Sequence, residues 1–181
     1  RSTLPTPRVR SRIANAEGDS VTYLAMAHLD LLRSVPFLST VPADDLKALA
    51  THAEVLPFRA GDEILPQGKP NQSLYIVFVF SLHASRMERG RRLMLRRLNP
   101  GSVFGELIAF DPGPTTGGVL AVTDGSVLRI QRSALDAFAA SHPAAGVEIY
   151  RRLLEQVAHR LRETDQRVSD LVSWGKLEPT H

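Results

Sequence analysis

Two acidic side chains, Glu106 and Asp111, lie close together in a segment predicted to be a turn. A pair of carboxylates can perform general acid–base chemistry when one is protonated and the other is ionised. The sequence supplies no activated nucleophile to accompany them, because it has no G-x-S-x-G motif and no cysteine. Acidic pairs in turns are common without catalysis, so we expect that the protein is not an enzyme.

Metal and nucleoside-triphosphate sites are also poorly supported. The 6 histidines are scattered with no pair at metal-ligand spacing, and the absence of cysteine excludes disulfides and thiolate ligands. The segment from Gly61 to Lys69 contains a Gly-Lys pair, but Pro70 replaces the Ser or Thr that would bind magnesium in a P-loop. We therefore expect no metal and no cofactor.

Arginines gather in two parts of the chain. The first group is Arg1, Arg8, Arg10 and Arg12, and the second is Arg86, Arg89, Arg91, Arg92, Arg96 and Arg97, opposed only by Glu88. Guanidinium groups bind phosphate in a bidentate manner, so the second group could contact lipid or nucleic acid. A solvated hairpin tip is the commoner explanation, and no aromatic side chains are interleaved. We expect no nucleic-acid binding by this chain.

The composition fits a globular domain with flanking helices. The chain has 181 residues, 43% of them hydrophobic, and a formal net charge of +3. No run approaches the roughly 20 apolar residues of a membrane-spanning helix, and no signal peptide is evident. We expect a cytoplasmic module, including the cytosolic domain of a membrane protein as a possibility. The chain begins at Arg1, which indicates a piece of a longer protein.

Helices are predicted before a glycine-rich central region. Residues 21–34 carry apolar side chains at helical spacing, and a second short helix should begin at Thr40 or Pro42 and end near Ala53. From Val55 to Ile130, short apolar runs alternate with glycines, which is typical of a compact β-roll. We divide the chain into a linker or disordered tail (1–20), a β-roll with N-terminal helices (21–143) and a long C-terminal helix (144–174).

Several elements within this region have clear signals. Residues 74–82 predict a strand, residues 86–97 a hairpin with Gly90 at its tip, and the segments VLAV and SVLRI two more strands. Residues 133–141 predict a short helix, with Ser133 and Asp136 at the spacing of a capping box.

The C-terminal segment is the most regular. Pro143 suits a first helical turn and Gly175 suits a stop. Between them, seven of eight seam positions are apolar: Val147, Leu154, Leu161 and Val168 in one series, and Tyr150, Val157, Thr164 and Leu171 in the other. This pattern predicts a homodimer through paired helices, with packing on the chain's own domain as the alternative. The remaining faces, including Arg151, Arg152, Glu155, Arg160, Arg162, Glu163 and Asp165, should be exposed.

Residues 37–139 resemble the cyclic nucleotide-binding domain family, of the catabolite-activator type. The first half shares Gly61, Ile64, Gly68, Leu74, Tyr75 and Ile76 with the family pattern, and the second half shares Pro100, Gly101, Phe104, Gly105, Glu106 and Leu107. The resemblance implies an α+β fold, an antiparallel β-roll of the double-stranded jelly-roll type flanked by N-terminal helices and a long C-terminal helix. It also implies a non-catalytic regulatory module.

The same resemblance implies a ligand site between Phe104 and about Val119. A cyclic nucleotide needs a hydrogen-bond acceptor for its ribose hydroxyl and donors with a positive charge for its phosphate. Glu106 stands where the family has its ribose-binding glutamate. The implied ligand-binding residues are Phe104, Gly105, Glu106, Leu107, Thr115 and Thr116.

Two departures from the family pattern concern this site. Thr115 stands where the family has its phosphate-binding arginine, so we expect weak or lost binding of cyclic AMP or cyclic GMP. A phosphate without its cation loses about 2–5 kcal/mol. Phe80 stands where the family usually has glycine, and it should be either a core residue or, less often, a plug of the pocket.

Three functions follow. The first is a regulatory domain of a larger protein, such as a transporter or channel, that passes a ligand signal to an attached domain or a dimer partner. The second is a dimerisation or interaction module that has lost its ligand. The third is the effector domain of a transcription regulator without its helix-turn-helix, since the segment after the long helix is too short for one.

Overall fold

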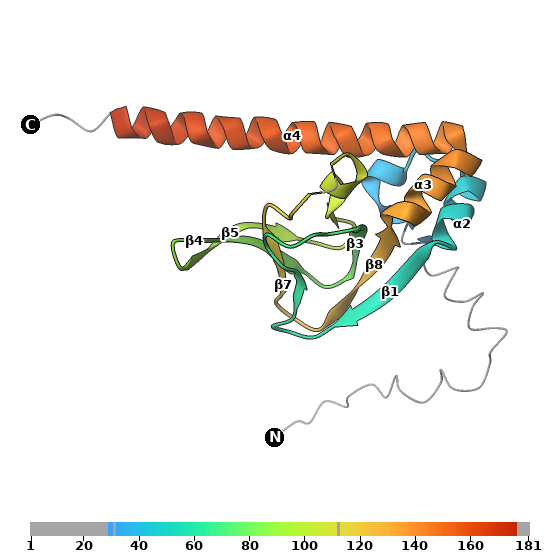
Figure 1. The fold of residues 1–181 in the computed structure, drawn as a ribbon, viewed down its shortest axis with the longest axis horizontal. Helices are drawn as coiled ribbons and strands as arrows, with labels where there is room; N and C mark the ends of the chain where they lie inside the picture. Colours follow the sequence, from blue (N-terminus) through green and yellow to red (C-terminus); the bar gives the residue numbers. More distant parts are fainter. Residues whose placement is uncertain (1–28, 31, 112, 177–181) are drawn as a thin grey trace, which may run out of the picture.

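The fold is a β-roll that lies beneath one long helix (Figure 1). The structure, a computed structural model, describes residues 29–30, 32–111 and 113–176. The helices are η1 (Pro36–Leu38), α2 (Ala43–Ala50), η2 (Glu106–Ala109), α3 (Arg132–Ser141) and α4 (Pro143–Lys176). The strands are β1 (Ala53–Phe58), β2 (Glu63–Leu65), β3 (Ser73–Val79), β4 (Leu82–Glu88), β5 (Arg91–Leu98), β6 (Val103–Phe104), β7 (Gly118–Ala121) and β8 (Gly125–Gln131).

The strands form two antiparallel sheets of four strands. One sheet has the order β1-β8-β3-β6 and the other has the order β2-β7-β4-β5. Some strands that pair are distant in sequence, as in β1 with β8, where Ala53 pairs with Ile130. This arrangement confirms the predicted α+β fold with an antiparallel β-roll, N-terminal helices and a long C-terminal helix.

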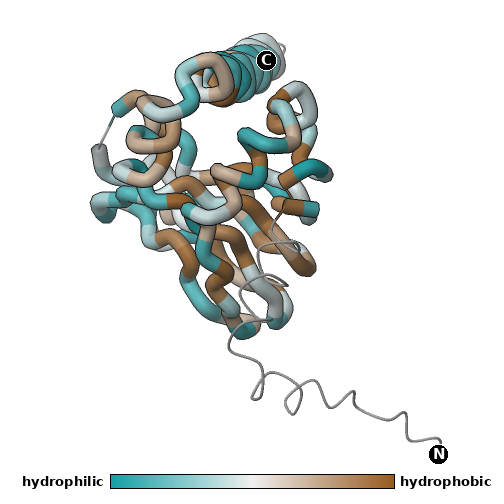
Figure 2. The backbone as a smooth tube through the Cα atoms, turned by 90° about the vertical axis from the view of Figure 1, so that its right-hand side faces the viewer, coloured by the Kyte–Doolittle hydropathy of each residue, from teal (hydrophilic) through white to brown (hydrophobic). Residues whose placement is uncertain are grey.

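Apolar side chains form two cores, one inside the roll and one under the helices. The first contains Val77, Leu82, Leu98 and Val127, each fully buried between the sheets. The second joins the other face of the β1-containing sheet to η1, α2, α3 and the N-terminal half of α4, with Phe138 at 0% exposure. Figure 2 shows brown, hydrophobic segments concentrated along the strands of the roll. Burial of both faces of this sheet fixes the roll against the helices.

The helices before the roll agree with the prediction only in part. Leu29–Asp30 and Leu32–Ser34 are helical, and the rest of the predicted helix over 21–34 lies outside the described residues, as does the predicted tail over 1–20. The second helix, α2, ends at Ala50 rather than near Ala53, because Ala53 already pairs with Ile130 in the sheet.

The hairpin is confirmed, and its tip explains why glycine is present. Strands β4 and β5 are joined by Arg89 and Gly90, which have φ angles of 49° and 77°. Two central residues with positive φ are characteristic of a type I′ turn, whose twist matches that of the flanking strands.

The strand predicted over residues 74–82 ends early, at Val79. Phe80 has a φ of 66° and its side chain is 58% exposed. The chain turns there and resumes as β4 at Leu82. Both expectations for Phe80, core residue and pocket plug, are therefore wrong. The left-handed backbone gives a physical reason for a glycine at this place, because a bulky side chain with positive φ is strained.

Two predicted helix signals are also wrong. Helix α3 is present, but its N-cap is Gln131 and no side chain caps it, so Ser133 and Asp136 do not form a capping box. Helix α4 begins at Pro143 as predicted but continues through Gly175 to Lys176. A glycine in a helix interior weakens a helix without necessarily ending it.

Candidate functional site

The predicted site begins at a tight turn between β6 and η2. Gly105 has a φ of 71°, and a Cβ added there would lie 2.7 Å from the Ser73 carbonyl oxygen and 2.9 Å from the Asn71 amide nitrogen. Only glycine fits this close approach. The Asn71 side chain holds the turn, because its Nδ2 donates to the Ser73 oxygen at 2.7 Å and to the Gly105 oxygen at 3.4 Å.

Four of the six predicted ligand-binding residues surround one cavity. Gly105, Leu107, Thr115 and Thr116 line a space of about 150 Å³ next to η2. Among its described lining residues, Asp111 is charged and no lysine or arginine is present. Small-molecule sites usually measure about 300–1,000 Å³, so this cavity is small for a nucleotide and carries the wrong charge for a phosphate.

The polar groups of Thr115 are already engaged by the turn after β2. Its hydroxyl donates to the Pro66 carbonyl oxygen, and its backbone N–H donates to the Lys69 oxygen at 3.0 Å. Its own carbonyl accepts a hydrogen bond from the Gly68 N–H at 2.9 Å. Thr115 therefore fixes the cavity wall, and its hydroxyl already has an acceptor other than a ligand. Thr116 is exposed at the rim.

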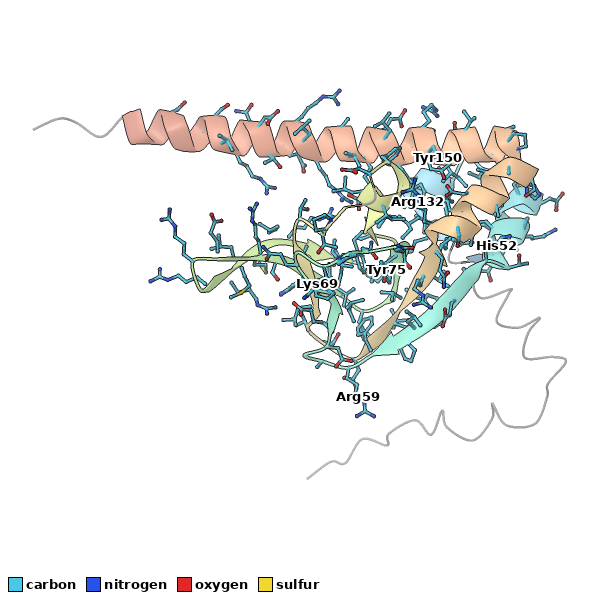
Figure 3. All side chains as sticks on the ribbon, in the orientation of Figure 1. His52, Arg59, Lys69, Tyr75, Arg132 and Tyr150 are labelled. Carbon is cyan, nitrogen blue, oxygen red and sulfur yellow. The ribbon has the colours of Figure 1, made fainter. Side chains whose placement is uncertain are left out.

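Phe104 lies in the core of the roll and does not line the cavity. Its ring stacks on Tyr75 with the centroids 5.0 Å apart and the planes at 8°. Both rings are buried, and Figure 3 shows Tyr75 in the interior of the roll. The contact holds β6 against β3 and so positions the Gly105 turn that follows.

Glu106 turns away from this cavity and meets the long helix. The Glu106 side chain is 6% exposed, and its carboxylate accepts a hydrogen bond from Nη1 of Arg160 in α4. The other terminal nitrogen of Arg160 donates to the Val103 carbonyl oxygen at 2.8 Å. The pair joins Glu106 at the start of η2 to a residue in the second half of α4.

The expectation that Arg160 lies on an exposed face is wrong, since its side chain is 25% exposed. Ile149 and Leu153 are buried and mark the face of α4 that packs against the rest of the chain. Arg160 lies seven residues, or about two helical turns, after Leu153 and is therefore on the same face. Arg160 is thus the functional candidate that the sequence reasoning missed. The signal was the Ile149–Leu153 spacing, which marks a buried face separate from the predicted dimer seam.

A second arginine lies beside this pair. Nη2 of Arg96 in β5 approaches the Val103 carbonyl oxygen at 3.4 Å, the same oxygen that Arg160 contacts. Burial lowers the pKa of Arg96, and the charge of Arg160 lowers it further, while Glu106 and Glu163 act in the opposite direction. The charge of Glu106 therefore acts on Arg96 as well, although the ion pair is with Arg160.

The first turns of α4 are anchored by two polar networks. Glu148 accepts a hydrogen bond from Thr40 at 2.6 Å, and that bond together with those from Arg151 and Arg152 lowers the pKa of Glu148 to about 2. Tyr150 donates to Asp136 in α3 at 2.7 Å, and burial together with this bond raises the pKa of Tyr150 to about 12. Figure 3 shows Tyr150 where α3 and α4 meet.

The rest of α4 is exposed along the predicted seam. Val147, Leu154, Leu161 and Val168 are 69%, 55%, 62% and 54% exposed. In the companion series, Tyr150 and Val157 are half-buried, Thr164 is exposed, and the side chain of Leu171 lies outside the described residues. One apolar series thus has no partner within the described chain.

Metal-binding clusters and membrane-spanning helices are both absent from the part of the chain that the structure describes. No group of three or more His, Cys, Asp or Glu residues there could hold a metal ion. None of the helices described has the length and apolarity needed to cross a membrane.

The sequence of the roll is similar to a known protein family. Residues 55–142 match the sequence model of the family described as cyclic nucleotide-binding domain. The chain is also 30% identical over 144 residues to the CRP-like cAMP-activated global transcriptional regulator of Mycobacterium tuberculosis. That alignment covers 79% of this chain and 62% of the relative, so the chain spans less than two thirds of the relative's length.

Solved structures give the same fold. The crystal structure of the catabolite activator protein of Thermus thermophilus is 27% identical with a TM-score of 0.68, over 76% of this chain and 63% of that chain. The N-terminal domain of a transcriptional regulator from Streptomyces coelicolor A3(2) is 28% identical with a TM-score of 0.65, over 77% of this chain and 95% of that chain.

Proposed function

We propose that this chain carries a cyclic nucleotide-binding regulatory domain, which senses a ligand at η2 and passes the signal through α4. The proposal assigns no catalytic role to any residue. It has three parts: coupling through Glu106 and Arg160, weak affinity for cyclic nucleotides, and output through a dimer or an attached domain.

The observation that carries the proposal is the ion pair between Glu106 and Arg160. A ligand hydroxyl in the cavity binds Glu106 when the carboxylate leaves Arg160 and turns towards the cavity, and this changes the free energy of holding α4 at this place. A ligand regulates only when it binds two arrangements of the helix with different affinity. Phe110, which directly follows η2, adds a second connection, since its ring meets Tyr150 of α4 edge-on at 6.2 Å.

The proposed affinity for cyclic AMP and cyclic GMP is weak, because no lysine or arginine is among the described residues that line the cavity at η2. Asp111 lines it, and Thr115 stands in place of the family's phosphate-binding arginine. Leaving a phosphate without a charged partner costs about 2–5 kcal/mol, which corresponds to a loss of roughly 30- to several-thousand-fold in affinity.

The proposed partner is a second copy of this chain, bound through α4. The exposed series Val147, Leu154, Leu161 and Val168 repeats every seven residues along one side of the helix. A narrow heptad stripe favours a helix–helix contact over other partners. The mixed charges beside it, such as those of Arg162 and Glu163, suit the flanks of such a pair.

The output is proposed to be transcription, through a part of the protein outside this sequence. The support is the name of the relatives, since the Mycobacterium tuberculosis and Streptomyces coelicolor proteins are described as transcriptional regulators. A regulatory domain of a transporter or channel remains the other proposed setting. The sequence of the full-length gene product distinguishes them by the presence or absence of a helix-turn-helix.

A second candidate function is a ligand-free dimerisation module, and the small cavity without a cation favours it. Calorimetric titration separates the two functions. The regulatory proposal expects saturable binding of cyclic AMP or cyclic GMP by the native chain, and the alternative expects none at ligand concentrations up to several millimolar.

The variant Thr115→Arg sharpens this test by supplying the missing cation. We expect it to tighten cyclic AMP binding by about 2 kcal/mol, or roughly 30-fold. Thr123→Arg is the matched control, because it adds the same charge at an exposed turn residue between β7 and β8. Equal affinities for the two variants would refute the assignment of the phosphate position. Native affinity below micromolar would refute the claim of weak binding.

A further inference from the structure

A groove on the other side of Arg160 has no role in the function proposed above. It measures about 470 Å³ and lies between η1, β5 and α4, away from the cavity that Gly105 and Thr115 line. Pro36 and Phe37 form its apolar wall, and Arg96 and Arg160 lie on its polar side. The volume is within the range of small-molecule sites.

The groove contains hydrogen-bonding groups without partners. Nε of Arg160 and Oε1 of Gln156 are both buried, and neither has a hydrogen-bond partner among the described residues. Buried polar atoms normally find partners, so unpaired atoms in two residues that line a groove require an explanation. Arg96 adds a guanidinium that donates a long hydrogen bond of 3.4 Å to the Val103 carbonyl oxygen.

Three arginines, Arg96, Arg152 and Arg160, and two acidic side chains, Glu155 and Glu163, line the groove. Arg160 pairs with Glu106, and Arg152 pairs with Glu155. Glu163 lies 3.6 Å from His159 and, together with Glu106, raises the pKa of Arg96 without a direct ion pair. Among the described residues, Arg96 is therefore the arginine of this groove that forms no ion pair.

We propose that this groove binds a small phosphate-type anion, an inorganic phosphate or a phosphomonoester, between Arg96 and Arg160. Guanidinium groups bind phosphate oxygens with paired N–H donors, and Nε of Arg160 supplies a further donor. The Gln156 oxygen accepts the P–OH proton of a monoprotonated phosphate. The bound anion neutralises the repulsion between the two arginines.

Titration of the full chain with inorganic phosphate at constant ionic strength tests this site. The probe is the Arg160 Nε–H resonance in a ¹⁵N-resolved NMR spectrum, assigned by its loss in Arg160→Lys. We expect a saturable shift of this resonance, with affinity reduced at least tenfold in Arg96→Gln. Arg97→Gln is the matched control, because it removes the same charge from the neighbouring exposed position of β5, and it should change the affinity less than twofold.

Two further arms identify the anion and separate this site from the cyclic nucleotide site. Tighter binding of phenyl phosphate than of inorganic phosphate supports a phosphomonoester, since the phenyl group can contact Phe37, and equal binding supports free phosphate. Glu106→Gln should retain phosphate binding even if it abolishes cyclic AMP binding. Equal losses in Arg96→Gln and Arg97→Gln, or a shift that does not saturate, would overturn the proposal.

Discussion

Removal of Arg160 should destabilise the fold, because it leaves the Glu106 carboxylate buried without its cation. Glu106 is 5% exposed, so water cannot replace the lost partner. Breaking a buried ion pair by removing one member typically costs about 3–5 kcal/mol. The Arg160 side chain is 25% exposed, and screening by water reduces the effect. We therefore expect Arg160→Leu to lower the free energy of unfolding by about 2–3 kcal/mol.

Thermal and urea unfolding followed by circular dichroism measure this loss. The melting temperature should fall by about 4–12 °C, given about 2–4 °C per kcal/mol for a domain of this size. Arg162→Leu is the matched control, since it removes the same charge two residues further along α4 at an exposed position, and it should change stability by less than about 0.5 kcal/mol.

A double variant tests the cause of the loss. Glu106→Leu combined with Arg160→Leu should recover part of the stability, because no buried charge then remains without a partner. An Arg160→Leu protein as stable as Arg162→Leu would refute the reasoning.

Three further predictions concern the turn, the seam and the start of α4. Phe80→Gly should stabilise the protein by about 1 kcal/mol, because glycine adopts the left-handed backbone at this position without strain. Phe80→Ala keeps the strain and should not stabilise the protein. Equal unfolding midpoints for the two variants would contradict this prediction. In sedimentation equilibrium at tens of micromolar, the native chain should be a dimer and Leu161→Glu should be a monomer, whereas Arg162→Glu should remain a dimer. A monomeric native chain would refute dimerisation through the apolar seam of α4. The pKa of Glu148 is lowered to about 2, so its contacts stabilise the fold above its usual pKa of 4.5 and are lost as the pH falls towards 2. Glu148→Gln should therefore be less stable than the native chain at pH 6, and the two should converge near pH 2; a difference that is the same at both pH values would contradict the assignment.

Local signals were sufficient for much of the fold. Glycine with β-forming residues predicts the hairpin at Gly90, because positive φ angles at a two-residue turn depend on the residues of the turn itself. The long helix is predictable for a similar reason, since the spacing of Val147, Leu154 and Leu161 is a local pattern. The Gly105–Glu106 turn is at the place that the family resemblance implies.

Contacts between distant segments could not be predicted in this way. The pairing of Glu106 with Arg160 joins residues 54 positions apart and depends on how α4 crosses the roll. The early end of α2 has the same origin, because Ala53 is drawn into the sheet by Ile130. Phe80 was misjudged because its residue type indicates burial, whereas its environment is set by the turn between β3 and β4.

The distance between the roll and α4, with and without ligand, tests the coupling most directly. The native chain has no cysteine, so Arg59→Cys and Arg167→Cys give two unique spin-label sites. Arg59 lies at the end of the roll far from α4 (Figure 3), and Arg167 lies within α4. In the Thr115→Arg background, saturating cyclic AMP should produce a second population of distances, and Arg160→Leu should remove the difference between free and bound protein. An unchanged distance distribution, with calorimetry showing that cyclic AMP is bound, would contradict signalling through α4.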